Sequence, residues 1–246
     1  GGLNSEQPGK LISEAASLLE QGVKEIILVA QDLTTFGRDL GDASLLKLVE
    51  SLLPLKGLAR LRLMYLYPAG LTEELLSSLA SFMVEGSPLV PYFDVPLQHS
   101  HPMILRAMGR PFAKDPGQVV ERIRRHIPQA SLRTSLIVGF PGEGDQEFAA
   151  LEDFVRSSRF HHLGVFPFWP EAGTRAAELP GQVADGEKLA RKDRIMEVQA
   201  DISRELLAPL QGKEMDILVD AAHTEWPGLY TGRTWFQAPE VDGVVY

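Results

Sequence analysis

Hydrophobic positions along this chain follow two alternating patterns. In the first, apolar residues recur every three or four positions, which is typical of an amphipathic helix. Leu11, Ile12, Ala15, Leu18 and Leu19 follow this pattern, and Gly22 is the residue type expected just after the last turn. In the second, apolar residues follow one another without a break, as in 25–30, which is typical of a strand buried on both faces of a parallel sheet.

These patterns predict five strands, each followed by a helix. Such alternation indicates a parallel sheet with right-handed crossovers, and therefore an α/β fold. Five units and one further strand before Gly1 would make a six-stranded open barrel, whereas an eight-unit barrel needs more chain than residues 1–208 offer. The expected strands are 25–30, 58–66, 91–97, 132–138 and 161–168, and the expected helices are 45–52, 71–83, 101–109, 115–127, 145–157 and 186–207, with Pro111 splitting 101–109 from 115–127.

The pattern changes after Gly212. Residues 214–220, 228–236 and 242–246 are short β-like runs, separated by turn signals at Pro227-Gly228 and Asp242-Gly243. We therefore expect two domains, a partial barrel over 1–208 and the opening strands of a small all-β domain over 212–246.

The composition narrows the classes of function. The net charge of -9 repels a phosphate backbone, so we expect no direct nucleic-acid binding and a basic protein partner instead. The chain has no cysteine, which excludes disulfides and thiolate ligands, and no metal site is expected. No apolar run reaches membrane-spanning length and no signal segment opens the chain, so we expect a cytoplasmic protein without a membrane partner. A start at Gly1 rather than Met is expected of a fragment.

Polar residues and glycines follow each predicted strand. In a parallel barrel the loops after the strands converge, and the chemistry takes place there. Gly139 and Gly142 would let the backbone approach a ligand, and free amides in this turn could meet an anionic or adenine group. The candidate ligand-binding residues at the strand ends are Gln31, Asp32, Tyr67, Gln98, His99, Val138, Gly139, Glu143 and Phe168.

Two charged residues lie inside apolar strands. Arg133 and Asp94 should each be paired, because a buried charge without a partner is costly. The partner of Arg133 is either a ligand carboxylate or a neighbouring aspartate, and we favour the aspartate.

Other polar residues have ordinary structural explanations. Glu143 could complement a helix dipole, and His99 could cap a helix. We expect His161 and His162 to be solvated, and the charges of 186–207 to form a solvated helix face. No hydrolase, zinc-protease, Walker or Rossmann motif is present, so no catalytic residue can be assigned. The residues alone indicate an α/β barrel whose polar rim binds a small molecule.

Four strings carry a resemblance to a known family. The strings EIILVAQDLTTFG (25–37), PYFDVPLQH (91–99), LRTSLIVGFPGE (132–143) and HLGVFPFWPEAGT (162–174) resemble the radical S-adenosylmethionine (SAM) methylthiotransferases, in order and along essentially the whole chain. The final segment resembles the start of that family's TRAM domain. The resemblance implies an open, partial radical SAM barrel of the TIM-like type.

Details of these strings favour one branch of the family. The branch that modifies tRNA adenosine, MiaB, usually carries GQNVNAY and PLQSGS where this chain has AQDLTTF (30–36) and PLQHS (96–100). The RimO branch, which modifies an aspartate of a small-subunit ribosomal protein, fits better. Residues 212–246 hold two basic and six acidic residues, a net charge of -4, which suits a basic ribosomal protein better than tRNA.

The resemblance also implies cofactors and a reaction. It implies SAM and two 4Fe-4S clusters in the full-length protein, with an electron donor and a radical that removes hydrogen from the aspartate β-carbon. Gln31, Asp94, Gln98 and Arg133 would contact SAM or substrate, and the turn 138–143 would hold the adenine or methionine moiety.

The chain departs from the family pattern in two places. The family's CxxxCxxC loop should lie just upstream of Gly1, since Gly1 to Ser5 resemble the GxxxS stretch that follows it, with Glu6 at the usual Arg position. Phe168-Trp169 stand where relatives often have Tyr-Ser. We therefore expect this chain alone to be inactive. The alternatives are a MiaB-like tRNA enzyme and a cluster-free, non-catalytic binding module.

Overall fold

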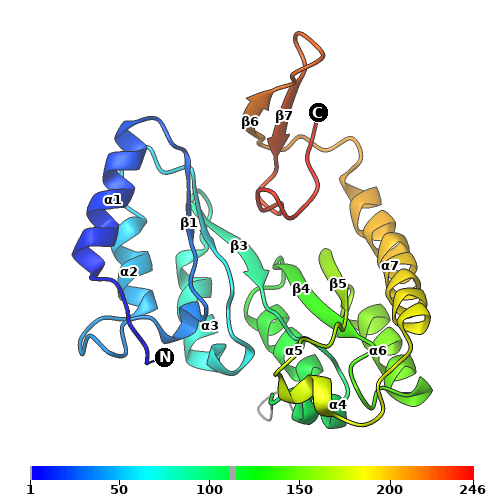
Figure 1. Ribbon diagram of the computed structural model, residues 1–246. Coiled ribbons are helices and arrows are strands. Elements are labelled where there is room, and N and C mark those ends of the chain that lie inside the picture. Colours follow the sequence, from blue (N-terminus) through cyan, green and yellow to red (C-terminus); the bar gives the residue numbers. More distant parts are fainter. Residues whose placement is uncertain (1, 111–114) are drawn as a thin grey trace. The chain divides into compact units, whose positions relative to one another are not determined.

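The computed structural model describes residues 2–110 and 115–246 (Figure 1). The expected break at Pro111, and Gly1 of the GxxxS-like stretch, lie outside this range. The chain forms two compact units. The first contains Gly1–Phe93, His126–Ala130 and Gly212–Tyr246, and the second contains Asp94–Arg125 and Ser131–Gln211. The division into domains at 208–212 stays a prediction, because the compact units follow different boundaries.

The first unit holds parallel strands with helices between them. Strand β1 pairs with β2, and β2 pairs with β3, in parallel. Ser44 and Thr72 accept hydrogen bonds from backbone amides in the first turns of α2 and α3, which fixes where these helices begin. The elements are α1 (Pro8–Glu20), β1 (Glu25–Leu28), the 3-10 helix η1 (Leu33–Thr35), α2 (Leu45–Leu52), β2 (Arg60–Leu63), η2 (Pro68–Gly70), α3 (Glu73–Phe82) and β3 (Leu89–Asp94), whose last residue belongs to the second unit.

The segment 212–246 also belongs to the first unit. Strands β6 (Leu218–Ala222) and β7 (Tyr230–Arg233) form an antiparallel pair, and Gly232 bridges to Val245. Three β-like runs were expected here, and the structure forms two strands and one isolated bridge. Ala238 packs with buried residues of the parallel strands, so this segment shares a hydrophobic cluster with them. Its other members are Met64, Val90 and Tyr92, with Ile27 and Trp235 packed against them.

A buried ion network ties 212–246 to the amino ends of β1 and β2. The carboxylate of Glu25 lies 2.9 Å from Arg62 Nη2 and 2.7 Å from Arg233 Nη1. Arg62 also donates to the carbonyl of Trp235 at 3.0 Å, and Arg60 donates to the carbonyl of Arg233 at 2.9 Å. Buried guanidinium groups need such partners, so this network positions the 212–246 segment as well as neutralising charge.

The second unit packs α7 against two strands and against α6. Strand β4 pairs in parallel with β5, and α7 contacts β5 and α6 (Figure 1). Leu151 and Val155 of α6, and Ile195 and Val198 of α7, are buried and belong to its core. Its elements are α4 (Pro102–Ala107), α5 (Pro116–His126, whose last residue belongs to the first unit), β4 (Ser131–Val138), α6 (Asp145–Ser158), β5 (His162–Pro167), η3 (Arg175–Glu178), α7 (Asp185–Leu207) and η4 (Ala208–Leu210).

The five predicted strands and the intervening helices are confirmed. The strand expected over 58–66 is shorter, because Tyr65 takes a φ of 57°, which an extended ladder cannot include. Two expectations were wrong. His161 is half-buried and accepts a hydrogen bond from the amide of Leu132, and Lys188 and Arg191 of α7 are buried rather than solvated. In the described part of the chain, no helix is long and apolar enough to cross a membrane.

Candidate functional site

The loop after β1 carries two of the expected site residues. Asp32 caps η1, accepting hydrogen bonds from the Thr34 amide at 2.9 Å and the Thr34 hydroxyl at 2.6 Å. Gln31 is exposed and stands next to this cap. Of the two side chains, therefore, Gln31 is the one with an open face toward a ligand, while Asp32 shapes the loop.

The loop after β2 packs closely on the loop after β1. The carbonyl of Tyr65 accepts from the amide of Leu33 at 3.3 Å. A Cβ added to Gly70 would lie 1.8 Å from the Thr34 hydroxyl, so only glycine fits this approach of η2 to η1. Tyr67 immediately precedes η2 and is half-buried. The two loops thus form one closely packed edge at the carboxyl ends of β1 and β2.

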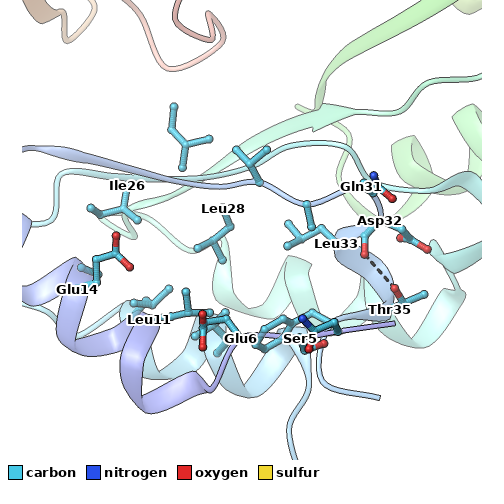
Figure 2. Close-up of a pocket in the computed structure, with 18 of the residues that line it drawn as sticks. Ser5, Glu6, Leu11, Glu14, Ile26, Leu28, Gln31, Asp32, Leu33 and Thr35 are labelled. Carbon is cyan, nitrogen blue, oxygen red and sulfur yellow. Dashed lines mark hydrogen bonds between the residues drawn. The ribbon is translucent and has the colours of Figure 1, made fainter. Parts of the chain in front are cut away.

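A cavity of about 800 Å³ lies beside this edge, within the first unit (Figure 2). Figure 2 shows Gln31 and Asp32 at one end and Leu11 and Glu14 at the other, with Ser5 between. Ser5 is held in place because its hydroxyl accepts from the Gly37 amide at 3.0 Å and its amide donates to Asp39 at 2.7 Å. Aliphatic side chains of α1, β1 and α2 line much of the remainder, a composition typical of small-molecule pockets.

The second unit holds the other expected residues. Arg133 of β4 pairs with Asp94 at 3.1 Å, which confirms the expectation of an aspartate partner. The segment after β3 runs along β4: the amides of Val95 and Gln98 donate to the carbonyls of Arg133 and Ser135, both at 2.9 Å. Gln98 does so with a φ of 70°, a costly conformation for a residue with a side chain. Such strain is frequent where a side chain is aimed at a ligand.

Strand β4 has one buried face and one partly open face. Leu132, Thr134, Leu136 and Val138 are buried, and the alternating residues Arg133, Ser135 and Ile137 are partly exposed. Gly164 of β5 pairs with Ser135, and Phe166 is 55% exposed. The open face therefore offers a guanidinium, a hydroxyl and apolar surface side by side. Ser135 and Phe166 were not singled out from the sequence, because short polar or aromatic residues within a strand carry no signal by themselves.

The turn after β4 is built around the carboxylate of Glu143. Its Oε1 accepts from the Gly139 amide at 2.9 Å, and its Oε2 lies 3.1 Å from His99 Nε2. His99 Nδ1 accepts from the amide of His101 at 2.9 Å, so Nε2 carries the ring proton and donates to Glu143. Both side chains are fully buried. Glu143 and His99 therefore stabilise the turn from the protein interior. Val138, at the start of the turn, is also buried.

Two residues of α7 that the sequence did not indicate, Arg191 and Lys188, contact this turn. Arg191 donates to Glu143 Oε1 at 2.8 Å and to the Glu143 carbonyl at 2.7 Å. A Cβ added to Gly139 would lie 2.3 Å from Lys188 Cγ, so the open side of this glycine is filled by a lysine stem. Phe168 donates its amide to the Val138 carbonyl at 2.8 Å, and its ring lies 5.0 Å from that of Phe140. The pattern of charges along 186–207 does not indicate that Lys188 and Arg191 have partners far away in the sequence.

Electrostatic effects near the start of β5 are dominated by burial. Burial lowers the pKa of His161 to about 4, with smaller contributions from His162 and Arg124. His161 is therefore neutral at physiological pH. At the start of α6, hydrogen bonds from backbone amides lower the pKa of Glu147, which keeps this exposed carboxylate ionised.

The described residues contain no group of three or more His, Cys, Asp or Glu side chains that could hold a metal ion, and the chain has no cysteine. Parallel strands whose carboxyl ends carry polar side chains and a glycine turn define a ligand-binding α/β fold. The radical SAM superfamily model matches residues 1–155, and the chain belongs to this superfamily. Membership implies SAM and a 4Fe-4S cluster as cofactors.

The TRAM domain model matches residues 212–246. Several curated proteins are similar to the chain and are named ribosomal protein uS12 methylthiotransferase RimO. The protein from Nitratidesulfovibrio vulgaris is 61% identical over 248 residues, which is 100% of this chain and 57% of that protein. The protein from Oleidesulfovibrio alaskensis is 57% identical over 247 residues, again 100% of this chain and 57% of that protein. The chain thus spans little more than half the length of these relatives.

Solved structures share the fold. The radical SAM methyltransferase TsrM from Kitasatospora setae has a TM-score of 0.51 and 19% identity, over 66% of this chain and 31% of that chain. Coproporphyrinogen III oxidase (HemN) from Escherichia coli has a TM-score of 0.51 and 15% identity, over 85% of this chain and 46% of that chain. At these identities the likeness concerns the fold alone, and it confirms the expected radical SAM fold class.

Proposed function

We propose that the full-length protein containing this chain is a radical SAM methylthiotransferase that modifies an aspartate of ribosomal protein uS12. The observation that carries this proposal is the identity of up to 61%, over the whole chain, to proteins named for that activity. The group placed on the aspartate β-carbon is a methylthio group, and SAM supplies the radical chemistry when bound.

The second unit has polar groups that fit SAM. Ser100 Oγ and His101 Nδ1 are buried, and neither finds a hydrogen-bond partner among the described residues. They follow closely after Gln98, whose backbone has a φ of 70° and whose side chain carries an amide. A ligand with hydroxyl, amino and carboxylate groups would satisfy such atoms. Gln98 and Arg133 would therefore hold polar parts of SAM or of the substrate, and the turn 138–143 would hold its adenine or methionine part.

The residues of this chain do not fit an iron–sulfur cluster. Cluster ligands are cysteine thiolates, and the chain has none. The two clusters and the electron donor proposed for the full-length protein would therefore depend on residues outside this chain. What the residues of this chain contribute is binding, orientation and exclusion of water.

The proposed partner is a basic ribosomal protein in the cytoplasm. The chain has a net charge of -9, and its 212–246 segment has two basic and six acidic residues. Complementary charge would speed association with a basic partner and would make that association sensitive to salt. The same charge disfavours a bare nucleic acid.

The experiment is a methylthiolation assay with the full-length protein. The protein is reconstituted with iron and sulfide, given SAM and reductant, and offered a uS12 peptide or tRNA. Mass spectrometry should show one methylthio group replacing a hydrogen on the peptide aspartate. Modification of tRNA in place of the peptide would move the assignment to the tRNA branch, and SAM binding without modification of either would favour a binding module.

Gln98 gives a sharp test of the proposed site. Gln98→Gly removes the amide and relieves the backbone strain, so the fold should be as stable as before or more so. Gln98→Asn keeps an amide and tolerates the same φ. SAM affinity, measured by equilibrium dialysis, should fall about tenfold in Gln98→Gly, which is the effect of one lost hydrogen bond of about 1.4 kcal/mol, and less in Gln98→Asn. Equal affinity in all three proteins would exclude Gln98 from the site.

A further inference from the structure

The start of α7 contains two buried cations that the proposed chemistry does not use. The side chains of Lys188 and Arg191 are 2% and 7% exposed, while Arg194, three residues further along the helix, is 49% exposed. Burying a charge is unfavourable unless it is paired and well bonded. We therefore ask which contacts compensate the burial of these two cations and what those contacts hold in place.

Arg191 closes the turn 139–143 at both ends. Through Glu143 Oε1 it is linked to the Gly139 amide at the start of the turn, and through the Glu143 carbonyl it holds the end of the turn directly. Arg191 also pairs with Glu187 of its own helix and, at 3.4 Å, with Asp145. A single guanidinium thus fixes the turn to α7.

Lys188 adds a packing contact and links the turn to the end of β5. Its Cγ occupies the space that a side chain at 139 would need. Its ammonium lies 5.8 Å from the centre of the Phe168 ring and 5.3 Å from that of Trp169, and it donates to Asp185 at 2.9 Å. The aliphatic stem of Lys188 therefore covers Gly139, while its ammonium group makes cation–π contacts with two aromatic rings.

We propose that Lys188, Arg191 and His99 are positioning residues for the turn 139–143. His99 bonds Oε2 of Glu143, Arg191 bonds Oε1, and the stem of Lys188 packs against Gly139. Together they form what we call the α7 latch. This inference rests on the proposed function, since the turn is the part of the second unit assigned to the adenine or methionine moiety of SAM. The latch residues are too buried to touch that ligand and act on it through the backbone amides of the turn.

The test separates the charge of the latch from its packing. Arg191→Lys keeps the positive charge but shortens the side chain and removes the second nitrogen, Nη2, which pairs with Glu187 and Asp145, so that the cation is no longer held against Glu143. Lys188→Met keeps the stem and removes the charge, whereas Lys188→Ala removes both. Arg194→Lys, on the same helix but exposed, is the matched control.

Hydrogen–deuterium exchange of the protein without SAM is the first readout, because it needs no activity. The Gly139 amide should exchange at least tenfold faster in Arg191→Lys and in Lys188→Ala, and at the native rate in Arg194→Lys. Lys188→Met should stay close to native, since its stem still covers Gly139. Unchanged exchange in Arg191→Lys would overturn the inference.

Affinity for SAM, in the full-length protein with its clusters reconstituted, is the second readout. It should fall about tenfold in Arg191→Lys and Lys188→Ala, with the thermal midpoint of the second unit lowered by only a few degrees. Faster exchange of Gly139 with native affinity would show that the turn does not hold SAM, and it would overturn the inference. If the unaltered protein failed to bind SAM while exchange still responded to Arg191→Lys, the proposed function would fail and the latch would remain as a structural device only.

Discussion

Removing the charge of Glu25 tests the ion network of the first unit. The side chain of Glu25 is 5% exposed and serves two guanidinium groups, those of Arg62 and Arg233, while Arg62 is completely buried. Glu25→Gln keeps the shape and one acceptor oxygen but removes the buried carboxylate from among Arg60, Arg62 and Arg233. The carboxylate of Asp220 still pairs with Arg233, and that of Asp216 still lies close enough to act on Arg60. The network then carries an uncompensated positive charge in a buried position.

The expected loss of stability follows from these contacts. Breaking one buried ion pair costs about 3–5 kcal/mol, and here one carboxylate serves two partners, so we expect about 4 kcal/mol. This is a large share of a typical stability of about 5–15 kcal/mol. For a chain of this size it corresponds to a fall of roughly 8–16 °C in the unfolding midpoint. Asp220→Asn is the control: its partner is also Arg233, but its side chain is 35% exposed, so the loss should be at most about 1 kcal/mol.

Trp235 can report this transition, because its carbonyl accepts from Arg62. Replacing the two exposed tryptophans, Trp169 and Trp226, with phenylalanine leaves Trp235 as the only fluorescent indole. Urea titrations of this background, with and without Glu25→Gln, give the difference in unfolding free energy. A loss below about 1 kcal/mol would refute the argument, since it would mean that water compensates for the missing carboxylate. Glu25→Leu combined with Arg62→Met should recover most of the loss, because apolar replacements of a buried pair are well tolerated.

Three further outcomes are expected. Gly70→Ala forces a Cβ to within 1.8 Å of the Thr34 hydroxyl and should cost about 1–3 kcal/mol in thermal unfolding, whereas Gly186→Ala, with no heavy atom within 4 Å of its new Cβ, should cost nothing. Because burial lowers the pKa of His161 from 6.5 to about 4, the unfolded chain binds the proton first as the pH falls, so stability should decline between pH 6.5 and 4. His161→Gln should remove about 2 kcal/mol of that decline when unfolding is measured at both pH values. Asp94→Asn removes a carboxylate charge that is 1% exposed and pairs with Arg133, and it should cost about 3 kcal/mol in urea unfolding, whereas a native-like midpoint would show that this pair contributes little to stability.

The order of the elements and one buried pair could be predicted because their signals are local. The apolar runs gave the five strands, since a run of such residues cannot remain in water. Arg133 and Asp94 were expected to have partners because a charge within an apolar strand demands one, and they proved to be each other's partners. This reasoning needs only the residues of the strand itself.

The latch could not be predicted, because its signals are distant in sequence. Arg191 and Glu143 are 48 positions apart, and nothing in a charged helix pattern tells which cation turns inward. Gly139 was expected to make room for a ligand, and its open side proved to be filled by Lys188. His161 was expected to be solvated, and burial beside Leu132 was visible only once β4 and β5 were paired.

The partnership between Arg62 and the Trp235 carbonyl has a consequence for biosynthesis. The two residues are 173 positions apart, and the whole second unit is encoded between them. A ribosome adding about 5–20 residues per second needs on the order of ten to thirty seconds to travel that distance. During this interval the arginines of β2 have no carbonyl partners, and the chain of the second unit is complete, at Gln211, before Trp235 is added. The second unit should therefore be able to fold before the first unit is complete, and β1 to β3 should be the part of this chain most dependent on chaperones.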